Sequence, residues 1–393
     1  MRVALLTREF PPDVYGGAGV HVEYLARELA AVEDLTVHAW GADRDGVVGH
    51  QAWDALAGSA PELAALRTMS IDLSMTAGVG DAELVHSHTW YANLAGHLAK
   101  LCYGIPHVAT VHSLEPLRPW KHEQLGGGYA LSSWCERVAI EGADAVIAVS
   151  EGMRRDVLSA YPAVDPGRVR VIYNGIDADE YTPDPGTDVL ERWGVDPARP
   201  SVVFVGRITR QKGVPYLVEA ALEVDPSAQI VLIAGAPDTP EIADEVRTGV
   251  ERLEAERGGV IWIEEMLPKP DVIQLLSHAT VFACPSIYEP LGIVNLEAMA
   301  CETAVVASAV GGIVEVVANG ETGILVPLQV ESSTLTPVDR EGFVHGLAAG
   351  INELVADPDR AAAMGRAGRE RAVTKFAWPA IARETSELYR SLS

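Results

Sequence analysis

The sequence predicts an α/β protein built from two doubly wound (Rossmann-like) domains, and three observations support this prediction. The chain has 393 residues, which is too long for one ordinary hydrophobic core. Short apolar segments alternate with longer segments whose apolar residues recur at helical spacing. An acidic, proline-rich stretch, residues 176–200, interrupts this alternation, which then resumes. Because strands that alternate with helices form a parallel sheet covered on both faces, each half of the chain should form one such sheet.

The first half contains six expected strands. Residues 20–32, 91–102 and 131–143 lie between them and have apolar side chains at helical spacing. Residues 43–80 have no clear period, so we expect irregular structure there. We assign the first domain to residues 1–175. Its expected strands have the sequences RVALLT, LTVHAW, ELVHSHT, PHVATVH, DAVIAVS and RVRVIYNG.

The second half repeats this organisation after residues 176–200, which we expect to be a linker. Six more apolar segments define a second domain at residues 201–376, and residues 377–393 have the spacing of a final helix. In doubly wound proteins, ligands bind outside the carboxyl ends of the strands, so we expect a site in a cleft between the domains. The expected strands are SVVFVGRI, QIVLIAGA, VIWIEEM, TVFACPS, TAVVASAV and TGILVP.

The charge of the chain excludes some partners. It contains 55 Asp and Glu residues against 30 Lys and Arg residues, a formal net charge of −25. Nucleic acid and anionic membrane surfaces would be repelled, so we expect neither as a partner. No segment approaches the roughly 20 apolar residues of a membrane span, and no signal peptide is evident. The 4 cysteines have no paired spacing, so we expect a cytoplasmic protein with reduced thiols, and a homodimer is compatible with the sequence.

Two cations lie in the turn RITRQKG, between an expected strand and an expected helix. Arg207 can offer two parallel N–H donors and Lys212 a point charge, and both lie near the positive end of a helix. This arrangement is suited to a diphosphate. The alternative is a solvated loop with surface ion pairs, and the spacing alone favours neither interpretation.

Two carboxylates follow another expected strand, in SIYEPLGIVNLEAMACETAVVAS. Glu289 lies at the end of that strand and Glu297 about one turn inside the next helix. Gly292 lies between them, where the backbone can approach a ligand closely. Carboxylates accept hydrogen bonds from sugar and ribose hydroxyls, so cations and carboxylates together would fit the two halves of a nucleotide sugar. The alternative is a helix-dipole partner and an exposed acid, which explains Glu297 poorly because its neighbours are apolar.

The combination R-x4-K-G followed by E-x7-E resembles the retaining GT-B glycosyltransferases of family 4, of the glycogen synthase and sucrose synthase type, over almost the whole chain. The opening LTREFPPDVYGGAGVHVEYLARELA is most similar to bacterial glycogen synthases of the actinobacterial kind. The resemblance implies a retaining, metal-independent hexosyltransferase of glycogen biosynthesis that needs no cofactor. It implies ADP-glucose as the donor. The acceptor would be glucose 1-phosphate, giving maltose 1-phosphate, or the non-reducing end of an α-1,4-glucan.

The resemblance also implies roles for the residues of the second, donor-binding domain. Arg207 and Lys212 would bind the diphosphate and stabilise it as it leaves. Glu297 would hold the ribose hydroxyls, and Glu289 the hydroxyls of the transferred glucose. The remaining donor-binding residues would contribute mainly backbone groups, near the base or near the distal phosphate, and they are Met266, Leu267, Leu291 and Gly292.

In the first, acceptor-binding domain, the loop YGGAG places Gly16 and Gly17 between a strand and a helix, where amides can approach a phosphate. The loop does not match GxGxxG, so a dinucleotide oxidoreductase is disfavoured. By resemblance, His112 would contact the donor sugar and Asn174 would lie at the hinge, although a structural histidine and an Asn-Gly turn are the ordinary alternatives. The resemblance further implies that a terminal helix at 377–393 completes this domain.

The acceptor-binding residues are expected in the loop LEPLRPWKHEQLGGGY. Arg118 and Lys121 would bind the phosphate of glucose 1-phosphate, and Trp120 offers a flat apolar face to a sugar. The alternative is a solvated loop. The prediction for a metal is that none is bound, because the three D-x-D pairs lie in loops, and because His86 and His88 share a strand face without a clear third ligand.

Other functions stay open at this point. A different family 4 hexosyltransferase would use a UDP- or GDP-sugar, and the base contacts expected from the backbone do not discriminate between donors. A nucleotide-sugar epimerase of GT-B architecture would need acid and base groups at the sugar and no acceptor. A non-catalytic sugar-binding protein with two lobes would bind without turnover.

Overall fold

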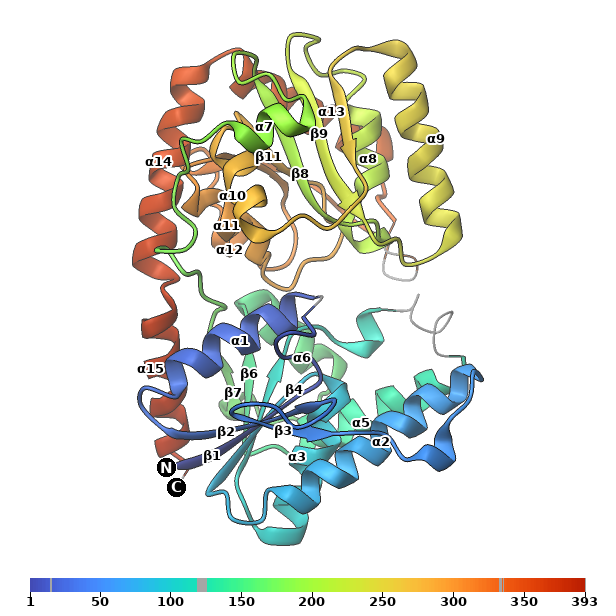
Figure 1. Cartoon of the computed structure of the whole chain (residues 1–393), viewed down its shortest axis with the longest axis vertical. Coiled ribbons are helices and arrows are strands. Elements are labelled where there is room, and N and C mark those ends of the chain that lie inside the picture. The colour runs from blue at the N-terminus through green and yellow to red at the C-terminus, as the bar shows by residue number, and fades with distance from the viewer. Residues whose placement is uncertain (15, 119–125, 332–333, 335, 393) are drawn as a thin grey trace. The chain divides into compact units, whose positions relative to one another are not determined.

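The computed structural model describes residues 1–14, 16–118, 126–331, 334 and 336–392. The chain forms two compact units (Figure 1): unit 1 contains Met1–Gly175 and Trp378–Ser393, and unit 2 contains Ile176–Ala377. Each unit has its own parallel sheet with helices packed on it, which confirms the predicted fold class.

Unit 1 contains a seven-stranded sheet in the order β3-β2-β1-β4-β5-β6-β7, in which neighbouring strands are parallel. The chain builds one half of the sheet outward from β1 and the other half outward from β4. The elements are β1 (Arg2–Thr7), α1 (Gly17–Leu29), β2 (Asp34–Trp40), β3 (Val47–His50), η1 (Asp54–Leu56), α2 (Pro61–Gly78), β4 (Leu84–His88), α3 (Trp90–Tyr103), β5 (His107–Val111), η2 (Glu115–Leu117), α5 (Gly128–Gly142), β6 (Ala145–Ala148), α6 (Glu151–Ala160), η3 (Pro166–Arg168), β7 (Val169–Val171) and α15 (Trp378–Arg390).

Alternate side chains of β1 enter two different cores, as the two-residue period of a strand requires. Val3 and Leu5 pack with residues of α1 and α15. Ala4 and Leu6 pack with residues of α2 and α3. Because both faces are covered, nearly every position of the strand is apolar, and each buried leucine contributes roughly 1.5–3 kcal/mol.

The expectation of irregular structure at residues 43–80 is wrong. This segment contains β3 and the 18-residue helix α2. The buried residues of α2 include Asp72 beside the apolar Ile71 and Met75. A helix that buries polar as well as apolar side chains has no clean apolar stripe, which is why its period was not recognised.

The C-terminal helix α15 packs on the N-terminal helix α1 within unit 1. The ring of Trp378 stacks on Tyr24, with centroids 5.8 Å apart. Gly175 lies against the same indole, and a Cβ there would be 2.5 Å from Cδ2 of Trp378. Further along the helix, Ser386 donates a hydrogen bond of 2.5 Å to Glu33. These contacts join the two ends of the chain.

Unit 2 contains a six-stranded parallel sheet in the order β10-β9-β8-β11-β12-β13. Val202 and Phe204 of β8 pack with residues of α8, α9 and α13, while α10 contacts β8 and α11 contacts β11. The elements are α7 (Asp188–Trp193), β8 (Ser201–Arg207), η4 (Arg210–Lys212), α8 (Val214–Ala220), β9 (Gln229–Gly235), α9 (Pro240–Glu256), β10 (Val260–Ile263), α10 (Lys269–Ser277), β11 (Val281–Cys284), α11 (Ile293–Ala300), β12 (Ala304–Ser308), α12 (Ile313–Val316), β13 (Gly323–Val326), α13 (Arg340–Val355) and α14 (Pro358–Lys375).

Residues 176–200, which we expected to be a linker, are part of unit 2. They include the short helix α7, whose Val189 and Leu190 are buried. The amide of Val189 donates a hydrogen bond of 2.7 Å to Oε1 of Gln274. Because the stretch is acidic and proline-rich, its two buried apolar side chains are a weak signal in the sequence. They pack the stretch against α10.

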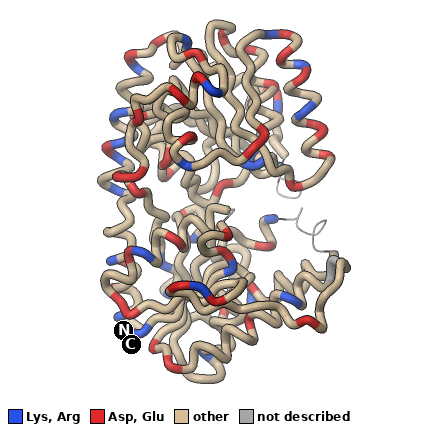
Figure 2. The backbone as a smooth tube through the Cα atoms, viewed as in Figure 1, with Lys and Arg blue, Asp and Glu red and all other residues tan. Residues whose placement is uncertain are grey.

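In each unit, the strands that begin the two halves of the sheet are neighbours: β1 and β4 in unit 1, and β8 and β11 in unit 2. The loops that follow these strands therefore leave the sheet at one edge, where doubly wound proteins bind ligands. Asp and Glu residues, red in Figure 2, are spread along both units. Among the helices of the described residues, none has the length and apolarity to cross a membrane.

Candidate active site

The turn with the two predicted diphosphate-binding cations follows β8 at the centre of the unit 2 sheet. The side chain of Thr209 caps this turn by accepting a hydrogen bond of 3.2 Å from the Lys212 amide. Gly213 ends it with a φ of +65°, and a Cβ at Gly213 would lie 2.1 Å from the carbonyl oxygen of Pro285. The glycine therefore allows the turn after β8 to lie directly against the loop after β11.

Lys212 and Glu289, which come from these two loops, form an ion pair. Nζ of Lys212 donates to Oε2 of Glu289 at 2.7 Å, and Oγ of Ser286 donates to the same oxygen at 3.2 Å. The two side chains are only 25% and 9% exposed. Burial disfavours the charged form of Lys212, but the adjacent Glu289 carboxylate outweighs burial and raises the pKa of Lys212 above its ordinary value. The site therefore contains a protonated lysine at neutral pH.

The loop after β11 enters α11 through Gly292, whose φ of +94° lies in the left-handed region. A Cβ at this position would be 2.5 Å from Nδ2 of Asn295, so glycine is required. The side chain of Leu291 is buried, with the residue 1% exposed. The loop can therefore offer backbone amides, rather than side chains, to an anion.

Glu297 lies one turn inside α11 and is held by a residue from the stretch before β8. The hydroxyl of Tyr181 donates a hydrogen bond of 2.9 Å to Oε1 of Glu297. Burial raises the pKa of Glu297, and the hydrogen bond from Tyr181 opposes part of this increase. Tyr181 is a residue of this site that sequence analysis missed, because it belongs to the stretch interpreted as a linker.

Arg207, the last residue of β8, is paired with Asp238 in the loop after β9 at 3.0 Å. The side chain of Arg207 is 46% exposed, so the guanidinium remains accessible to a ligand. The loop after β10 carries Met266, which is 68% exposed, and the half-buried Leu267. An exposed thioether at the end of a strand provides an apolar surface that a nucleobase can contact.

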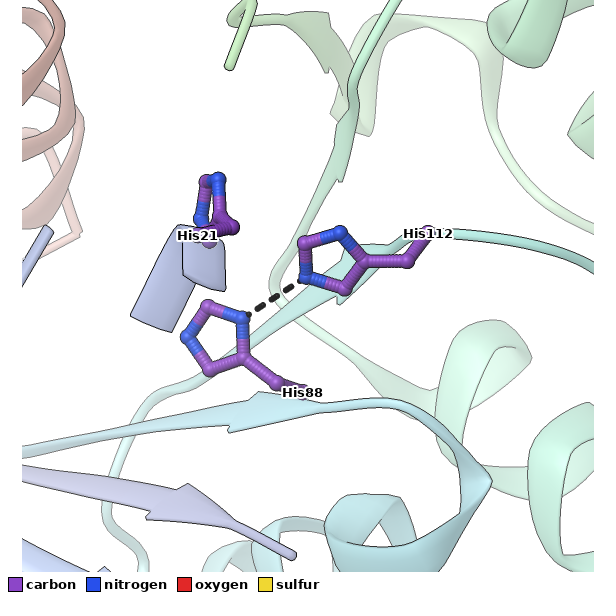
Figure 3. A group of neighbouring side chains, drawn as sticks. All are labelled: His21, His88 and His112. Carbon is purple, nitrogen blue, oxygen red and sulfur yellow. Dashed lines mark hydrogen bonds between the residues drawn. The ribbon is translucent and has the colours of Figure 1, made fainter. Parts of the chain in front are cut away.

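His112, which follows β5 in unit 1, lies beside two other histidines (Figure 3). Its Nε2 shares a hydrogen bond of 3.1 Å with Nδ1 of His88, the last residue of β4. The ring of His21, on α1, lies edge-on to His112 with centroids 4.6 Å apart. Burial lowers the pKa of His112 to about 3, so its ring is neutral at pH 7. Burial, and then the neighbouring His112, also lower the pKa of His21, which the nearby Asn174 side chain opposes.

The glycine loop after β1 already holds a carboxylate of the chain. The Gly16 amide donates a hydrogen bond of 2.9 Å to Oε2 of Glu9, and Gly17 begins α1. A Cβ at Gly19 would be 2.6 Å from the same oxygen. Glu9 thus lies at the amide that we expected to bind a phosphate, and an external anion would have to displace it.

Arg118, one of the predicted acceptor-binding residues, contacts groups of the protein. Its Nη1 donates a hydrogen bond of 3.1 Å to Oγ of Ser113 and lies 3.8 Å from Oε1 of Glu115. The Arg118 side chain is 19% exposed. Trp120 and Lys121, the other two predicted acceptor-binding residues, lie outside the described residues.

A buried pair of carboxyl groups anchors the loop after β5. Oε1 of Glu136, on α5, accepts hydrogen bonds from the Glu115 amide at 2.9 Å and from the hydroxyl of Tyr161 at 2.5 Å. Burial, reinforced by the charge of Glu115, raises the pKa of Glu136 to about 8. This network fixes the backbone that connects His112 to Arg118.

His86 and His88 lie two residues apart on β4, and the sequence alone indicates no third ligand beside them. The structure separates their roles. His86 shares hydrogen bonds of 2.5 Å with Tyr389 and 2.6 Å with Thr110. His88 instead joins the cluster in Figure 3, whose helical member, His21, has no motif of its own. Only the packing of α1 against the sheet could reveal this residue.

A separate hollow of about 720 Å³ lies along edge strand β7 in unit 1, lined by residues of α6, β7 and α15. It contains none of the predicted site residues. The loops after the central strands therefore remain the candidate active-site regions of the two units.

The chain is similar to known glycosyltransferases in both sequence and fold. Residues 15–180 match the family described as Glycosyltransferase Family 4, and residues 199–336 match Glycosyl transferases group 1. The chain is 58% identical to the alpha-maltose-1-phosphate synthase of Mycolicibacterium smegmatis, with 100% of both chains covered. It is 28% identical to the glycogen synthase of Mycobacterium tuberculosis, covering 99% of this chain and 94% of that protein. The sucrose-phosphate synthase from Thermosynechococcus elongatus has a similar structure, with a TM-score of 0.81, 27% identity and coverage of 100% of this chain and 98% of that chain.

Proposed function

The chain belongs to glycosyltransferase family 4, and we propose that it transfers glucose from ADP-glucose to glucose 1-phosphate, which yields maltose 1-phosphate. Its similarity over the full length to an alpha-maltose-1-phosphate synthase supports maltose 1-phosphate as the product, while ADP-glucose as the donor is inferred from the resemblance of the sequence motifs. The structural observation that carries the proposal is the ion pair of Lys212 with Glu289 beside the central strands of unit 2. It provides a cation for a leaving diphosphate and a carboxylate for a sugar.

Lys212 can keep its ion pair while it binds the donor. An ammonium group has three N–H donors, and the bond to Glu289 uses one of them. Negative charge on the diphosphate increases as its bond to the sugar breaks, so a preorganised cation stabilises the transition state more than the bound donor. The exposed guanidinium of Arg207 supplies a second cation at the end of the same strand.

The two carboxylates retain acceptor capacity for the hydroxyls of the donor. The hydrogen bonds to the Glu289 side chain from Lys212 and Ser286 both use Oε2. Oε1 of Glu289 then accepts from the glucose hydroxyls, and Oε2 of Glu297 from the ribose hydroxyls. The position of Glu297 is set by the hydrogen bond from Tyr181 to its other oxygen.

The transfer proceeds with retention and without a metal ion. The bond between the anomeric carbon and the phosphate oxygen breaks, and its electron pair leaves with ADP. A hydroxyl oxygen of glucose 1-phosphate bonds to the anomeric carbon on the same face, and its proton passes to the departing phosphate oxygen. His112 is neutral, because burial lowers its pKa to about 3, and it orients the donor sugar by hydrogen bonding.

The proposed phosphate ligand of the acceptor is Arg118. Its Nη1 is engaged with Ser113 and Glu115, whereas its Nε has no hydrogen-bond partner among the described residues, so the guanidinium keeps donors for a phosphate. Elongation of an α-1,4-glucan is the second candidate activity, and the similarity to a glycogen synthase favours it.

The free cysteines support the expected cytoplasmic location.

The test combines the purified chain with ADP-glucose and glucose 1-phosphate in the presence of EDTA. Mass spectrometry should detect a disaccharide monophosphate together with ADP, and proton NMR should show an α-linkage. Parallel reactions contain UDP-glucose, GDP-glucose or a maltooligosaccharide acceptor. Faster transfer from UDP-glucose or GDP-glucose would contradict the donor, and faster elongation of the maltooligosaccharide would contradict the acceptor. If the donor sugar is converted to an epimer in the absence of an acceptor, the chain is an epimerase and the proposed transferase activity is wrong.

A further inference from the structure

Three imidazole rings from different parts of unit 1 meet beside the central strands (Figure 3). His21 comes from α1, His88 is the last residue of β4, and His112 follows β5. One nitrogen atom of each ring can be chosen so that all three lie within 4.8 Å of one another. His21 and His88 are buried, whereas His112 is partly exposed. The cluster is therefore preassembled and reachable from solvent on one side.

The hydrogen bonds within the described chain do not satisfy this cluster. His88 and His112 share one hydrogen bond of 3.1 Å. Among the described residues, neither Nε2 of His88 nor either nitrogen of His21 has a hydrogen-bond partner of regular geometry, although the Asn174 side chain lies near His21 and opposes part of the decrease in its pKa. Each unsatisfied buried polar group costs about 1–3 kcal/mol. Several unsatisfied polar groups that lie together in a native protein need an explanation, and a bound ligand that satisfies them is one such explanation.

The protonation state of the rings suits a metal ion. Burial lowers the pKa values of His21, His88 and His112 far below that of a free histidine, to about 3 for His112. Each ring is therefore neutral at pH 7 and has a lone pair on one nitrogen. A bound cation would use these lone pairs without first displacing a proton.

The chemistry of the donors selects the class of metal. Three imidazoles without a carboxylate favour Zn²⁺, Co²⁺, Ni²⁺ or Cu²⁺ over Mg²⁺, Ca²⁺ or Mn²⁺, which prefer oxygen ligands. A tetrahedral zinc ion with Zn–N bonds of about 2.0–2.1 Å needs nitrogen atoms roughly 3.3 Å apart. The three nitrogens are at most 4.8 Å apart, so movements of the side chains by about an ångström would bring them to this spacing. On the partly exposed side of His112, a water molecule would be the fourth ligand.

We propose that His21, His88 and His112 form a binding site for a divalent transition metal of the zinc class, and that its occupation inhibits glycosyl transfer. The metal would bind Nε2 of His112 and fix the orientation of its ring. His112 could then no longer form the hydrogen bonds that donor binding needs. Metal binding itself does not depend on the proposed function, whereas the inhibition does. The transfer reaction needs no metal, because Arg207 and Lys212 supply the positive charge.

The binding test uses the full chain stripped of metal with a chelator and titrated with Co²⁺. We expect one Co²⁺ per chain, with the visible absorption of a four-coordinate nitrogen site, and displacement by Zn²⁺ but not by Mg²⁺. H21Q and H88Q should each weaken binding at least 10-fold. H38Q is the matched control, because His38 belongs to a buried histidine pair of the same unit with a hydrogen bond of 2.9 Å.

Two results would overturn the metal site. The first is the absence of stoichiometric binding by the wild-type chain. The second is equal Co²⁺ affinity of H21Q, H88Q and the wild type. If a variant does not fold, X-ray absorption of the zinc-loaded wild type still decides, since the proposal requires three histidine nitrogens around the metal.

The activity test measures transfer at increasing free Zn²⁺. We expect inhibition that EDTA reverses, and a shift of at least 10-fold in the inhibitory concentration for H21Q, measured against the metal-free rate of that variant. Zinc that binds without slowing transfer would refute the inhibition. If the wild type shows no transferase activity at all, the proposed function fails while the Co²⁺ titration still tests the metal site.

Discussion

Unit 1 buries neutral histidines beside the ends of its central strands, whereas unit 2 places ion pairs at the corresponding position of a sheet of the same type. Of the 11 histidines in the chain, only His278 and His345 belong to the second half. In unit 1, burial lowers the pKa of His88 well below its ordinary value and that of His112 to about 3. In unit 2, the Glu289 carboxylate keeps Lys212 protonated despite burial.

This contrast shows how one sheet topology can support two kinds of chemistry. Buried imidazoles provide hydrogen bonds or metal ligands without net charge, and they are suited to orient a neutral sugar. Partly buried cations with a carboxylate partner provide fixed charge where a leaving group becomes negative. The two units should therefore respond differently to pH and to the removal of single charges.

Acidification is expected to have the largest effect and to act on unit 1. Burial lowers the pKa of His38 to about 4 and that of His107 to about 3, from an ordinary value of 6.5. The unfolded chain thus binds more protons, so the stabilisation present above pH 6.5 is lost progressively as the pH falls toward 3. Each unit of pKa difference corresponds to about 1.4 kcal/mol, so a few such histidines approach the roughly 5–15 kcal/mol that stabilises a whole domain.

Hydrogen exchange measured by mass spectrometry between pH 7 and pH 4 checks this, after correction for the intrinsic exchange rate. Peptides of unit 1 should lose protection before peptides of unit 2. Earlier loss of protection in unit 2 would contradict the comparison.

Substitution of Lys212 by alanine is expected to have the next largest effect. K212A removes the cation at the proposed leaving group and should lower kcat about 100-fold, or roughly 3 kcal/mol. The control is R252A, which breaks an exposed ion pair of 2.7 Å with Glu256 in the same unit and should leave kcat unchanged. Steady-state kinetics with saturating donor measures both. A wild-type kcat for K212A would contradict the proposal that the charge of Lys212 in unit 2 stabilises the leaving group.

The Glu136 carboxyl should make unit 1 less stable as the pH rises, whereas the buried histidines make it more stable. The substitution E136Q should remove the contribution of the carboxyl. Because burial raises the pKa of Glu136 from 4.5 to about 8, the folded chain binds the proton more tightly, and stability falls as the pH rises through this interval. Glutamine stays neutral, so urea unfolding should show a decrease between pH 5 and pH 8 that is smaller by roughly 1–3 kcal/mol. An unchanged slope would mean that Glu136 is already ionised at pH 5.

The smallest expected effect is that of D238N, which releases Arg207 from its ion pair of 3.0 Å. Exposed pairs contribute about 0–1 kcal/mol, so KM for the donor should change less than about 5-fold. The direction is informative: a higher KM means that Asp238 positions the guanidinium, and a lower KM means that it competes with the diphosphate. E256Q, which removes a carboxylate from the exposed pair on α9, is the control.

Much of the fold followed from the sequence because both faces of each parallel sheet are covered. The resulting strands contain continuous apolar runs that are easily recognised, such as residues 202–206 and 230–236. Helix α2 was missed because it buries Asp72 among apolar residues, and α7 was missed because two buried side chains in an acidic stretch are a weak signal. Predictions from the pattern of apolar residues fail where a buried side chain is polar, or where a few buried apolar side chains lie in an acidic stretch.

For the candidate site, local features of the sequence were enough to identify which side chains with useful chemistry follow the central strands. Arg207, Lys212 and Glu289 were recognised because strand ends and glycines are local features of the chain. The partners of these side chains are known only from the packing, which places Tyr181 beside Glu297 and His21 in the histidine cluster. These contacts join residues more than 60 positions apart, and the distances and burial that set their charge states depend on how the elements pack. The sequence therefore specified the components, and packing specified their neighbours, their protonation and the chemistry open to them.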